Sequence, residues 1–262
     1  MEPADLTRLR EWFDRYCRTF YVDDAEAQRN IILKEEHTRR VCANMELLVE
    51  SLCLDEGSRL LAMTVALFHD VGRFEQYRRY GTFKDAASVN HAVLGARVLT
   101  EERVLDTLPT AEQSIIILAV SLHNVFALPA DLDEATGLHL RLIRDADKLD
   151  IWRVFLDYYR APAEERASAV SLGFADRPGC SPDVLACLGE RKMVNLSQLV
   201  TLNDFKLLQL SWVHDLNFSA SFRLAWEQGY LAGIAATLPA VPEVQEVVMA
   251  VLAELERRAT LY

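Results

Sequence analysis

Apolar residues recur at intervals of three and four positions along most of the chain, which is the spacing of one face of an α-helix. The first such segment predicts an amphipathic helix over residues 6–20, with Asp5 as its N-cap. Further helices are expected within residues 30–54, 60–68, 88–99, 112–122, 138–159, 197–238 and 244–258. No segment alternates apolar and polar residues as a strand does, and there is no internal repeat or glycine-rich phosphate loop. The predicted fold class is therefore all-α.

Segments that depart from this apolar spacing predict turns, connections and helix ends. Residues 115–120 suit a strand by their β-branching, but they contain no turn residues and lie between helices, which favours a buried helix. Residues 73–84 have no long apolar period, so we expect either a solvated connector or a gate for substrate. We expect Gly72 to let the backbone leave the preceding helix, and Ser88 to cap the helix that follows. Residues 160–190 are rich in Ala, Ser, Gly and Pro and predict an irregular connection with helical turns.

The main chemical signal follows the apolar run over residues 60–68. This run lacks Gly and Pro, is rich in Leu and Ala, and is followed directly by His69 and Asp70. Burying an imidazole next to a carboxylate costs free energy unless both groups are hydrogen-bonded or bound to a metal. We therefore expect other polar side chains to converge on this pair.

The candidates for this convergence lie in order on separate helical segments: His37, His91, His123 and Asp147. Taken singly, each fits a structural role, because a lone histidine on a helix is usually a satisfied core or surface residue. As an ordered set with His69 and Asp70, they resemble the HD superfamily of metal-dependent phosphohydrolases, in which His, then His-Asp, then Asp lie on consecutive helices. The matched region runs from about residue 37 to residue 150, which is under half of the chain.

The resemblance implies ligands for one metal ion at four positions: His37, His69, Asp70 and Asp147. Asp147 is preferred to Asp145, because superfamily members typically follow this ligand with a basic, an apolar and then a polar residue. His91 and His123 look like the two extra histidines of binuclear members, in which Asp70 then bridges both ions. The competing interpretation makes these two histidines substrate-contacting or acid–base groups around a single metal.

Phosphate ester hydrolysis needs a water activated near neutral pH and a cation beside the phosphoryl oxygens, and divalent metals supply both. Imidazoles combined with carboxylates favour one or two ions of Fe, Mn, Co, Ni or Zn over Mg or Ca. The residues expected to take part in catalysis are Asp70, His91, His123 and Lys148. The cations expected to hold the substrate phosphate are Arg73, Arg78, Arg79, Lys84 and Lys148.

We expect a single all-α domain over residues 1–262, with an HD core at about residues 30–160 and a C-terminal helical extension at about residues 190–262. The pair His214-Asp215 copies the signature dipeptide but has no apolar helix before it, so we expect a packed or surface pair. His139 is expected to be structural.

Subfamily motifs narrow the substrate only in part. Residues 73–74 are Arg-Phe where alarmone hydrolases of the superfamily have Glu-Asp, and the Gly-Tyr-Pro signature of cyclic-dinucleotide phosphodiesterases is absent. Triphosphohydrolases acting on deoxynucleotides are usually larger, so the expected substrate is a small phosphorylated metabolite or nucleotide. Two alternatives stay open: a mixed-valence di-iron oxygenase that cleaves a C–C or C–P bond, and a non-catalytic nucleotide-binding sensor.

Composition excludes several classes of protein. The formal net charge of −11 argues against a general nucleic-acid or anionic-membrane surface. The five cysteines form no CxxC pair, so reduced thiols fit better than a zinc site or a disulfide framework. No signal peptide is apparent, and no apolar run approaches the ~20 residues of a membrane span. We expect a soluble, cytoplasmic protein whose partner is a small phosphorylated substrate, with no nucleic-acid polymer or membrane as partner; a homo-oligomer is compatible with the sequence.

Overall fold

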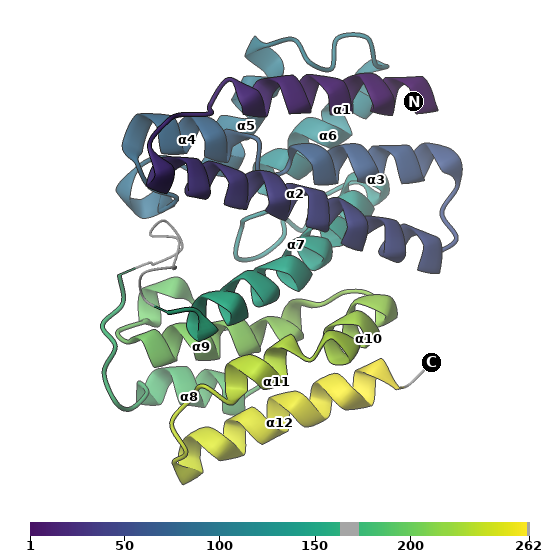
Figure 1. Cartoon of the computed structure of the whole chain (residues 1–262). Helices are drawn as coiled ribbons and strands as arrows, with labels where there is room; N and C mark the ends of the chain where they lie inside the picture. The colour runs from purple at the N-terminus through teal and green to yellow at the C-terminus, as the bar shows by residue number, and fades with distance from the viewer. Residues whose placement is uncertain (163–172, 261–262) are drawn as a thin grey trace. The chain divides into compact units, whose positions relative to one another are not determined.

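The computed structural model describes residues 1–162 and 173–260, and within them the regular elements are helices (Figure 1). One isolated bridge pairs Ala175 with Thr201 outside any named strand. The all-α prediction is confirmed. The backbone divides into two compact units whose boundary along the chain falls between Asp147 and Lys148. We refer to these as unit 1 and unit 2; the single-domain organisation stays a prediction.

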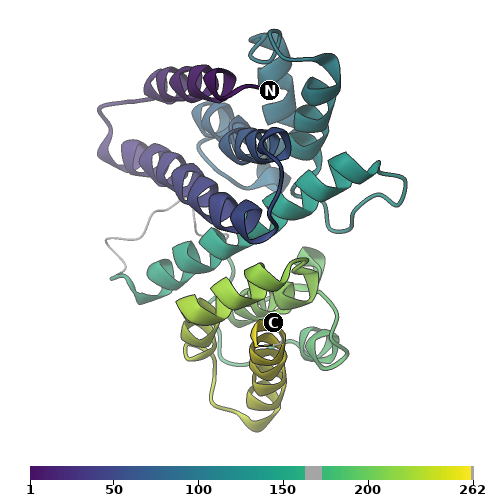
Figure 2. The ribbon, with the colours of Figure 1, turned by 90° about the vertical axis from the view of Figure 1, so that its right-hand side faces the viewer.

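Unit 1 holds the first half of the chain. Its helices are α1 (Pro3–Arg18), α2 (Ala25–Ser51), α3 (Glu56–Phe68), α4 (Gly72–Tyr80), α5 (His91–Glu101), α6 (Thr110–Leu122) and the part of α7 (Glu134–Arg160) up to Asp147, with a 3₁₀ helix over Asp85–Ala87. The chain reverses direction between α1 and α2 (Figure 2). All residues over 60–68 of α3 are buried, as expected for its apolar run, and α3 packs against α1, α2 and α6.

An aromatic layer joins α1 to the end of α3 and to α4. The Phe13 ring centroid lies 6.4 Å from that of Phe68 and 5.9 Å from that of Phe74, both with edge-to-face geometry. Edge-to-face pairs stabilise the fold beyond the free energy gained by burying the rings, and they favour one relative orientation of the rings. The layer fixes the backbone on both sides of residues 69–71, which lie between α3 and α4.

The structure corrects three predictions about where helices begin. α1 begins at Pro3 rather than at residue 6, and Asp5 lies inside its first turn, where it accepts a hydrogen bond from the Glu2 N–H at 3.0 Å. Asn90, and not Ser88, caps α5 by accepting from the backbone N–H groups of the second and third helical residues. Polar side chains at neighbouring positions can each accept from the unpaired N–H groups at the start of a helix. Apolar periodicity therefore does not determine which of them is the N-cap.

The predicted connector over residues 73–84 is wrong in its first part, because residues 72–80 form α4. The apolar pattern of α4 is too short to predict a helix. Ion pairs from Glu75 to Arg78 and Arg79, one turn later, stabilise this helix. Gly81, with φ 64°, ends the helix in the left-handed conformation that glycine favours. Gly72 belongs to α4 instead of ending α3, and its role is a close approach to α5 that we return to in the Discussion.

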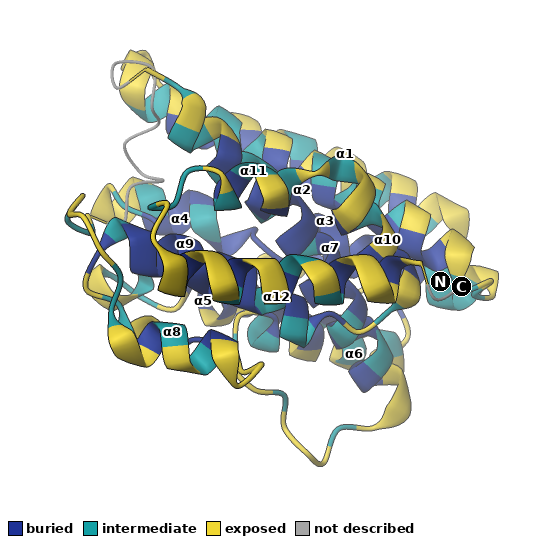
Figure 3. Ribbon diagram, turned by 90° about the horizontal axis from the view of Figure 1, so that it is seen from below, coloured by how far each residue is buried: buried dark blue, intermediate teal, exposed yellow. Residues whose placement is uncertain are grey.

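Unit 2 holds the second part of α7 and the C-terminal helices. These are α8 (Pro182–Gly189), α9 (Leu202–Ser211), α10 (Ser219–Gln228), α11 (Tyr230–Ala235) and α12 (Pro242–Ala259), with 3₁₀ helices over Leu196–Gln198 and Trp212–Asp215. Trp152 of α7 is fully buried in the core of this unit and donates to the Gln209 carbonyl at 2.9 Å. The predicted final amphipathic helix corresponds to α12, whose exposed residues face the viewer in Figure 3. Part of the predicted irregular connection, residues 163–172, lies outside the described residues.

Candidate metal centre

Unit 1 brings together the six residues predicted to bind metal, which we call the six-residue cluster. They come from α2, the end of α3, the start of α5, the end of α6 and α7: His37, His69, Asp70, His91, His123 and Asp147. Three of these histidines lie at helix ends, where a side chain can point between helices. The first five are at most 5% exposed, and the Asp147 side chain is 16% exposed.

Asp70 lies between two pairs of histidines. Its Oδ2 is 3.5 Å from His37 Nε2 and 3.7 Å from His69 Nε2. Its Oδ1 is 3.3 Å from His91 Nε2 and 3.9 Å from His123 Nε2. Asp70 thus forms one triad with His37 and His69 and another with His91 and His123. Within each triad the potential ligand atoms all lie within 4.8 Å of one another. One carboxylate oxygen therefore faces each histidine pair.

Asp147 joins the pair formed by His37 and His69. Its Oδ1 lies 3.0 Å from His37 Nε2 and 3.6 Å from His69 Nε2. This oxygen is buried and accepts no hydrogen bond within the described residues. A buried carboxylate oxygen without a hydrogen bond is costly unless a cation binds it.

Hydrogen bonds fix which nitrogen carries the proton in three of the cluster histidines, His69, His123 and His91. His69 Nδ1 lies 2.8 Å from the Ala66 carbonyl, and His123 Nδ1 lies 2.8 Å from the Val120 carbonyl. Because a carbonyl only accepts, each Nδ1 must donate, and each Nε2 of a neutral ring then presents a lone pair. His91 follows the same rule, with its Nδ1 directed at the carboxylate of Asp85.

These lone pairs point at one another. Nε2 of His91 lies 3.1 Å from Nε2 of His123, so that the lone pairs of these two neutral rings face each other. In the other pair, the Nε2 lone pair of His69 lies 3.4 Å from His37 Nε2. Two facing lone pairs repel unless a cation lies between them. Neutral imidazoles with carboxylates are the donor set that first-row transition metals prefer, so the residues present fit metal ions of this kind.

The electrostatic environment keeps these groups in the ionisation states that metal binding requires. Burial raises the pKa of Asp70, but the charges of Lys34, His69 and Arg73 lower it by more. The pKa of Asp70 therefore lies well below its usual range. Burial, together with the nearby His91 and His69, lowers the pKa of His123 to about 3. Burial also lowers the pKa of His91. Asp70 is thus ionised and both histidines are neutral at pH 7, as metal ligands must be.

Two residues at the cluster are absent from the sequence-based prediction. Lys34 Nζ binds Asp70 Oδ2 at 2.7 Å and lies 5.5 Å from the Phe83 ring centroid. Asp85 binds His91. Lys34 precedes His37 by one helical turn, so the i, i+3 spacing places both on one face of α2 and could have identified it.

The predicted phosphate-binding cations occupy different environments. Arg73 is at the cluster, with Nε 3.4 Å from Asp70 Oδ1 and an ion pair to Asp85 at 3.1 Å. Arg78 and Arg79 pair instead with Glu75 at the end of α4. Lys84 is half-buried in the segment after α4, where its carbonyl accepts a hydrogen bond from the Ser88 hydroxyl at 2.7 Å. Of these four cations, Arg73 is the one that contacts the cluster.

Lys148 and His139 have structural partners. Lys148 pairs with Asp215 at 2.6 Å within unit 2, and the neighbouring His214 is half-buried. The predicted catalytic and phosphate-binding roles of Lys148 stay predictions. His139 is buried and contacts the Ala135 and Ser58 carbonyls at 2.7 and 3.1 Å, as expected for a structural histidine.

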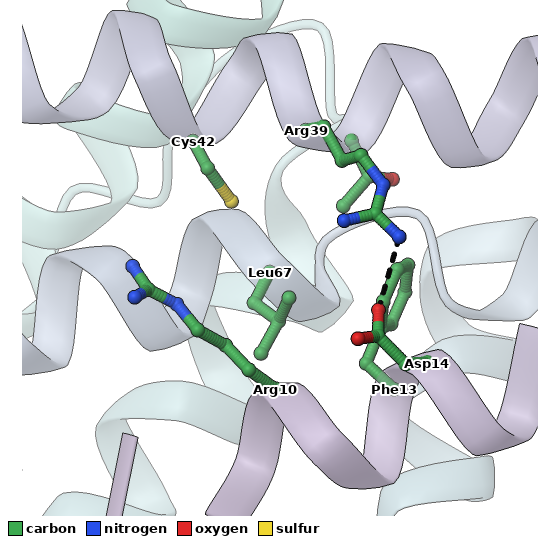
Figure 4. A pocket seen from close by; sticks show the side chains of 7 residues that line it. Arg10, Phe13, Asp14, Arg39, Cys42 and Leu67 are labelled. Atoms are coloured by element: carbon green, nitrogen blue, oxygen red, sulfur yellow. Dashed lines mark hydrogen bonds and ion pairs between the residues drawn. The ribbon is translucent and has the colours of Figure 1, made fainter. Parts of the chain in front are cut away.

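A separate pocket of about 290 Å³ in unit 1 lies among α1, α2 and α3 (Figure 4). Its lining residues are Arg10, Phe13, Asp14, Thr38, Arg39, Cys42 and Leu67. Arg39 pairs with Asp14 at 3.1 Å beside it. None of the six cluster residues lines this pocket, so it is distinct from the candidate metal centre.

Comparisons with known proteins and protein families show what the chain is similar to. None of the described helices is both long and apolar enough to span a bilayer. Comparisons with curated proteins and with solved structures gave no significant match. The family model of the HD domain matches residues 35–152, a little under half of the chain, and this segment contains the whole six-residue cluster. Residues 35–152 therefore belong to the HD domain family, which consists generally of metal-dependent phosphohydrolases.

Proposed function

We propose that the protein is a two-metal phosphohydrolase that acts on a small phosphorylated metabolite or nucleotide. The observation that carries the proposal is the position of Asp70, whose two oxygens each face one pair of histidines. A carboxylate in this position suits a bridge between two cations. His37, His69 and Asp147 would complete the first ion's ligands, and His91 and His123 would complete the second.

The bound metals would supply a water of lowered pKa and positive charge for the phosphoryl oxygens. The chain's own residues have separate tasks. Asp70 is held ionised between the histidine pairs by Lys34 and Arg73. These two cations approach Asp70 from different sides, Lys34 at Oδ2 and Arg73 at Oδ1. Once Asp70 binds metal, both cations are placed to bind the oxygens of an incoming phosphate.

The size and charge of this arrangement support a small substrate. A phosphate monoester carries up to two negative charges near neutral pH, which matches the two cations beside Asp70. The net charge of −11 disfavours a long polyanion, because nucleic-acid backbones are bound by clustered basic residues. The metabolite or nucleotide itself would be recognised by groups beyond this phosphate site.

The proposed activity is tested by a screen of phosphorylated metabolites and nucleotides with the metal-reconstituted protein. We expect phosphate release that depends on added Mn²⁺ or Fe²⁺ and proceeds equally well without oxygen. Oxygen consumption coupled to substrate loss, without phosphate release, would instead support the di-iron oxygenase chemistry. Substrate binding without turnover in the metal-loaded protein would support a sensor.

Removing one histidine of the second pair is expected to halve the metal content. His91→Ala and His123→Ala should each lower the bound metal from about two equivalents to about one, because an inner-sphere ligand is lost. His139→Ala is the matched control, since His139 is a buried histidine outside the cluster. Elemental analysis after dialysis gives the stoichiometry. One equivalent in the native protein and in both variants would return His91 and His123 to an acid–base or structural role.

Neutralising Lys34 is expected to weaken substrate binding without loss of metal. Lys34→Gln should raise KM for the best phosphorylated substrate by about 10- to 100-fold, the effect of losing one charged hydrogen bond. Its metal affinity should stay equal or rise, because a cation that repels the metal is removed from Asp70. Steady-state kinetics and elemental analysis measure both, with the exposed Lys192→Gln as control. An unchanged KM would remove Lys34 from the phosphate site.

A further inference from the structure

We infer that Asp85 is a positioning residue that holds the His91 ring with Nε2 directed at Asp70, and that it thereby builds the second metal site. The metal part of this inference rests on the proposed function. No motif in the sequence marks Asp85, which lies in the 3₁₀ helix before α5. Its role is argued from three features of unit 1: the contact with His91, the position of His91 in its helix, and the groups that fix Asp85 itself.

The contact between Asp85 and His91 involves both carboxylate oxygens. His91 Nδ1 lies 2.9 Å from Oδ1 and 2.8 Å from Oδ2 of Asp85. His91 Nε2, on the other side of the ring, lies 3.3 Å from Asp70 Oδ1. Because an ionised carboxylate only accepts, this contact places the proton on Nδ1 and leaves the Nε2 lone pair for a metal.

The position of His91 explains why it needs a side-chain partner. His69 and His123 follow the last turns of α3 and α6, so a backbone carbonyl three residues earlier accepts from each Nδ1. His91 is the first residue of α5, and no helical turn precedes it. A carbonyl aligned in the same way is therefore missing, and Asp85 provides the acceptor instead.

Asp85 is itself held by donors from two other segments. Gln76 of α4 donates to Oδ1 at 2.8 Å, and Asn124 after α6 donates to Oδ2 at 3.2 Å. Arg73 pairs with the same Oδ1 at 3.1 Å. Gln76 is fully buried and also donates to the Val89 carbonyl at 2.9 Å, which ties the segment before α5 to α4. With its rotamer fixed from several directions, Asp85 can determine the orientation of His91 instead of following it.

Two consequences follow for the His91 side of the centre alone. First, loss of the carboxylate should release the His91 tautomer, so that Nδ1–H and Nε2–H forms both become populated. Second, affinity for the second metal ion should fall by about 10- to 100-fold, the usual cost of removing an outer partner of a ligating histidine. The ion held by His37, His69 and Asp147 should be unaffected, because Asp85 contacts none of these residues.

The test compares Asp85→Ala, Asp85→Asn and the control Asp106→Asn, an exposed aspartate paired with Arg103 outside the cluster. Long-range ¹H–¹⁵N correlation spectra of the metal-free protein report the tautomer of His91, assigned by its absence in His91→Gln. Titration with Mn²⁺ gives the affinity for each ion. We expect a mixed tautomer in Asp85→Ala and weaker binding of one ion in both Asp85 variants, with native behaviour in the control.

A pure Nδ1–H tautomer for His91 together with native affinity for both ions in the Asp85 variants would overturn the inference. If Asp85→Ala does not fold by circular dichroism, the affinities of the isosteric Asp85→Asn decide the question alone. Failure of the proposed two-metal centre gives a different result, since the native protein would then bind fewer than two ions. The tautomer spectra would in that case still test whether Asp85 orients His91. Failure of the phosphohydrolase activity alone would leave the tautomer and both metal affinities as predicted here.

Discussion

Replacing Asp70 with asparagine is expected to remove the bound metal from both sites and to lower phosphate release by at least about 10³-fold. Among the described residues, Asp70 is the group that both candidate metal triads share, with one oxygen toward each histidine pair. A neutral amide lacks the charge that offsets two cations, and a loss of several kcal/mol of transition-state stabilisation corresponds to this factor. Elemental analysis and a phosphate-release assay measure the two effects on the same preparation.

The matched control for Asp70→Asn is Asp133→Asn, which makes the same chemical change at an exposed carboxylate before α7. It should keep native metal content and native phosphate release. If Asp70→Asn were as active as this control, the two-site account of the cluster would be wrong. Loss of activity with both ions retained would limit Asp70 to a role in the reaction and exclude it as a required ligand.

Replacing Gly72 with alanine is expected to lower the free energy of unfolding by about 3 kcal/mol and to reduce metal binding at the His91 side. A Cβ on Gly72 would lie 2.5 Å from the Gly95 backbone nitrogen and closer still to the His91 carbonyl oxygen. Both neighbours are backbone atoms, which cannot rotate away as a side chain can. The start of α5 must therefore move, and His91 moves with it.

Gly189→Ala is the control for this substitution, because a Cβ there would meet no atom within 4 Å. It should change stability by less than about 0.5 kcal/mol, as substitutions at open positions usually do. Urea denaturation gives the stability of each variant, and Mn²⁺ titration gives the metal affinity. A Gly72→Ala protein as stable as the control would show that α4 and α5 can separate without cost, and the close approach would not constrain His91.

Much of the fold could be predicted from the sequence, because the strongest signals are local. The apolar run over residues 60–68 predicted a buried helix that ends at a histidine and an aspartate, and the structure confirms both. The isoleucine-rich run over residues 115–120 is helical, as its lack of turn residues indicated. Periodicity failed for α4, where three aromatic residues in nine positions are too short a pattern to identify a helix. It also failed at helix starts, where several adjacent polar residues can cap equally well.

The residues of the candidate site also divide into those that the sequence predicted and those that it did not. The ordered motif identified six residues that the structure brings together, and all six lie within the segment that matches the HD domain. Asp85 carries no such signal, because its contact with His91 arises only in the folded chain. For Lys34, the signal is its position one helical turn before His37, and its partner Asp70 is 36 residues away in the sequence. The basic residues after Asp70 were grouped by sequence proximity, yet the helical geometry of α4 directs Arg78 and Arg79 toward Glu75 and leaves Arg73 at the cluster.

The metal content of the purified native protein tests the central claim most directly. Elemental analysis of protein purified without chelator, and of protein reconstituted with Mn²⁺ or Fe²⁺ and then dialysed, gives the number of ions per chain. The arrangement of two histidine pairs about Asp70 predicts about two equivalents of a first-row transition metal. A protein that retains none after reconstitution, although it is folded by circular dichroism, would contradict a metal centre at this cluster.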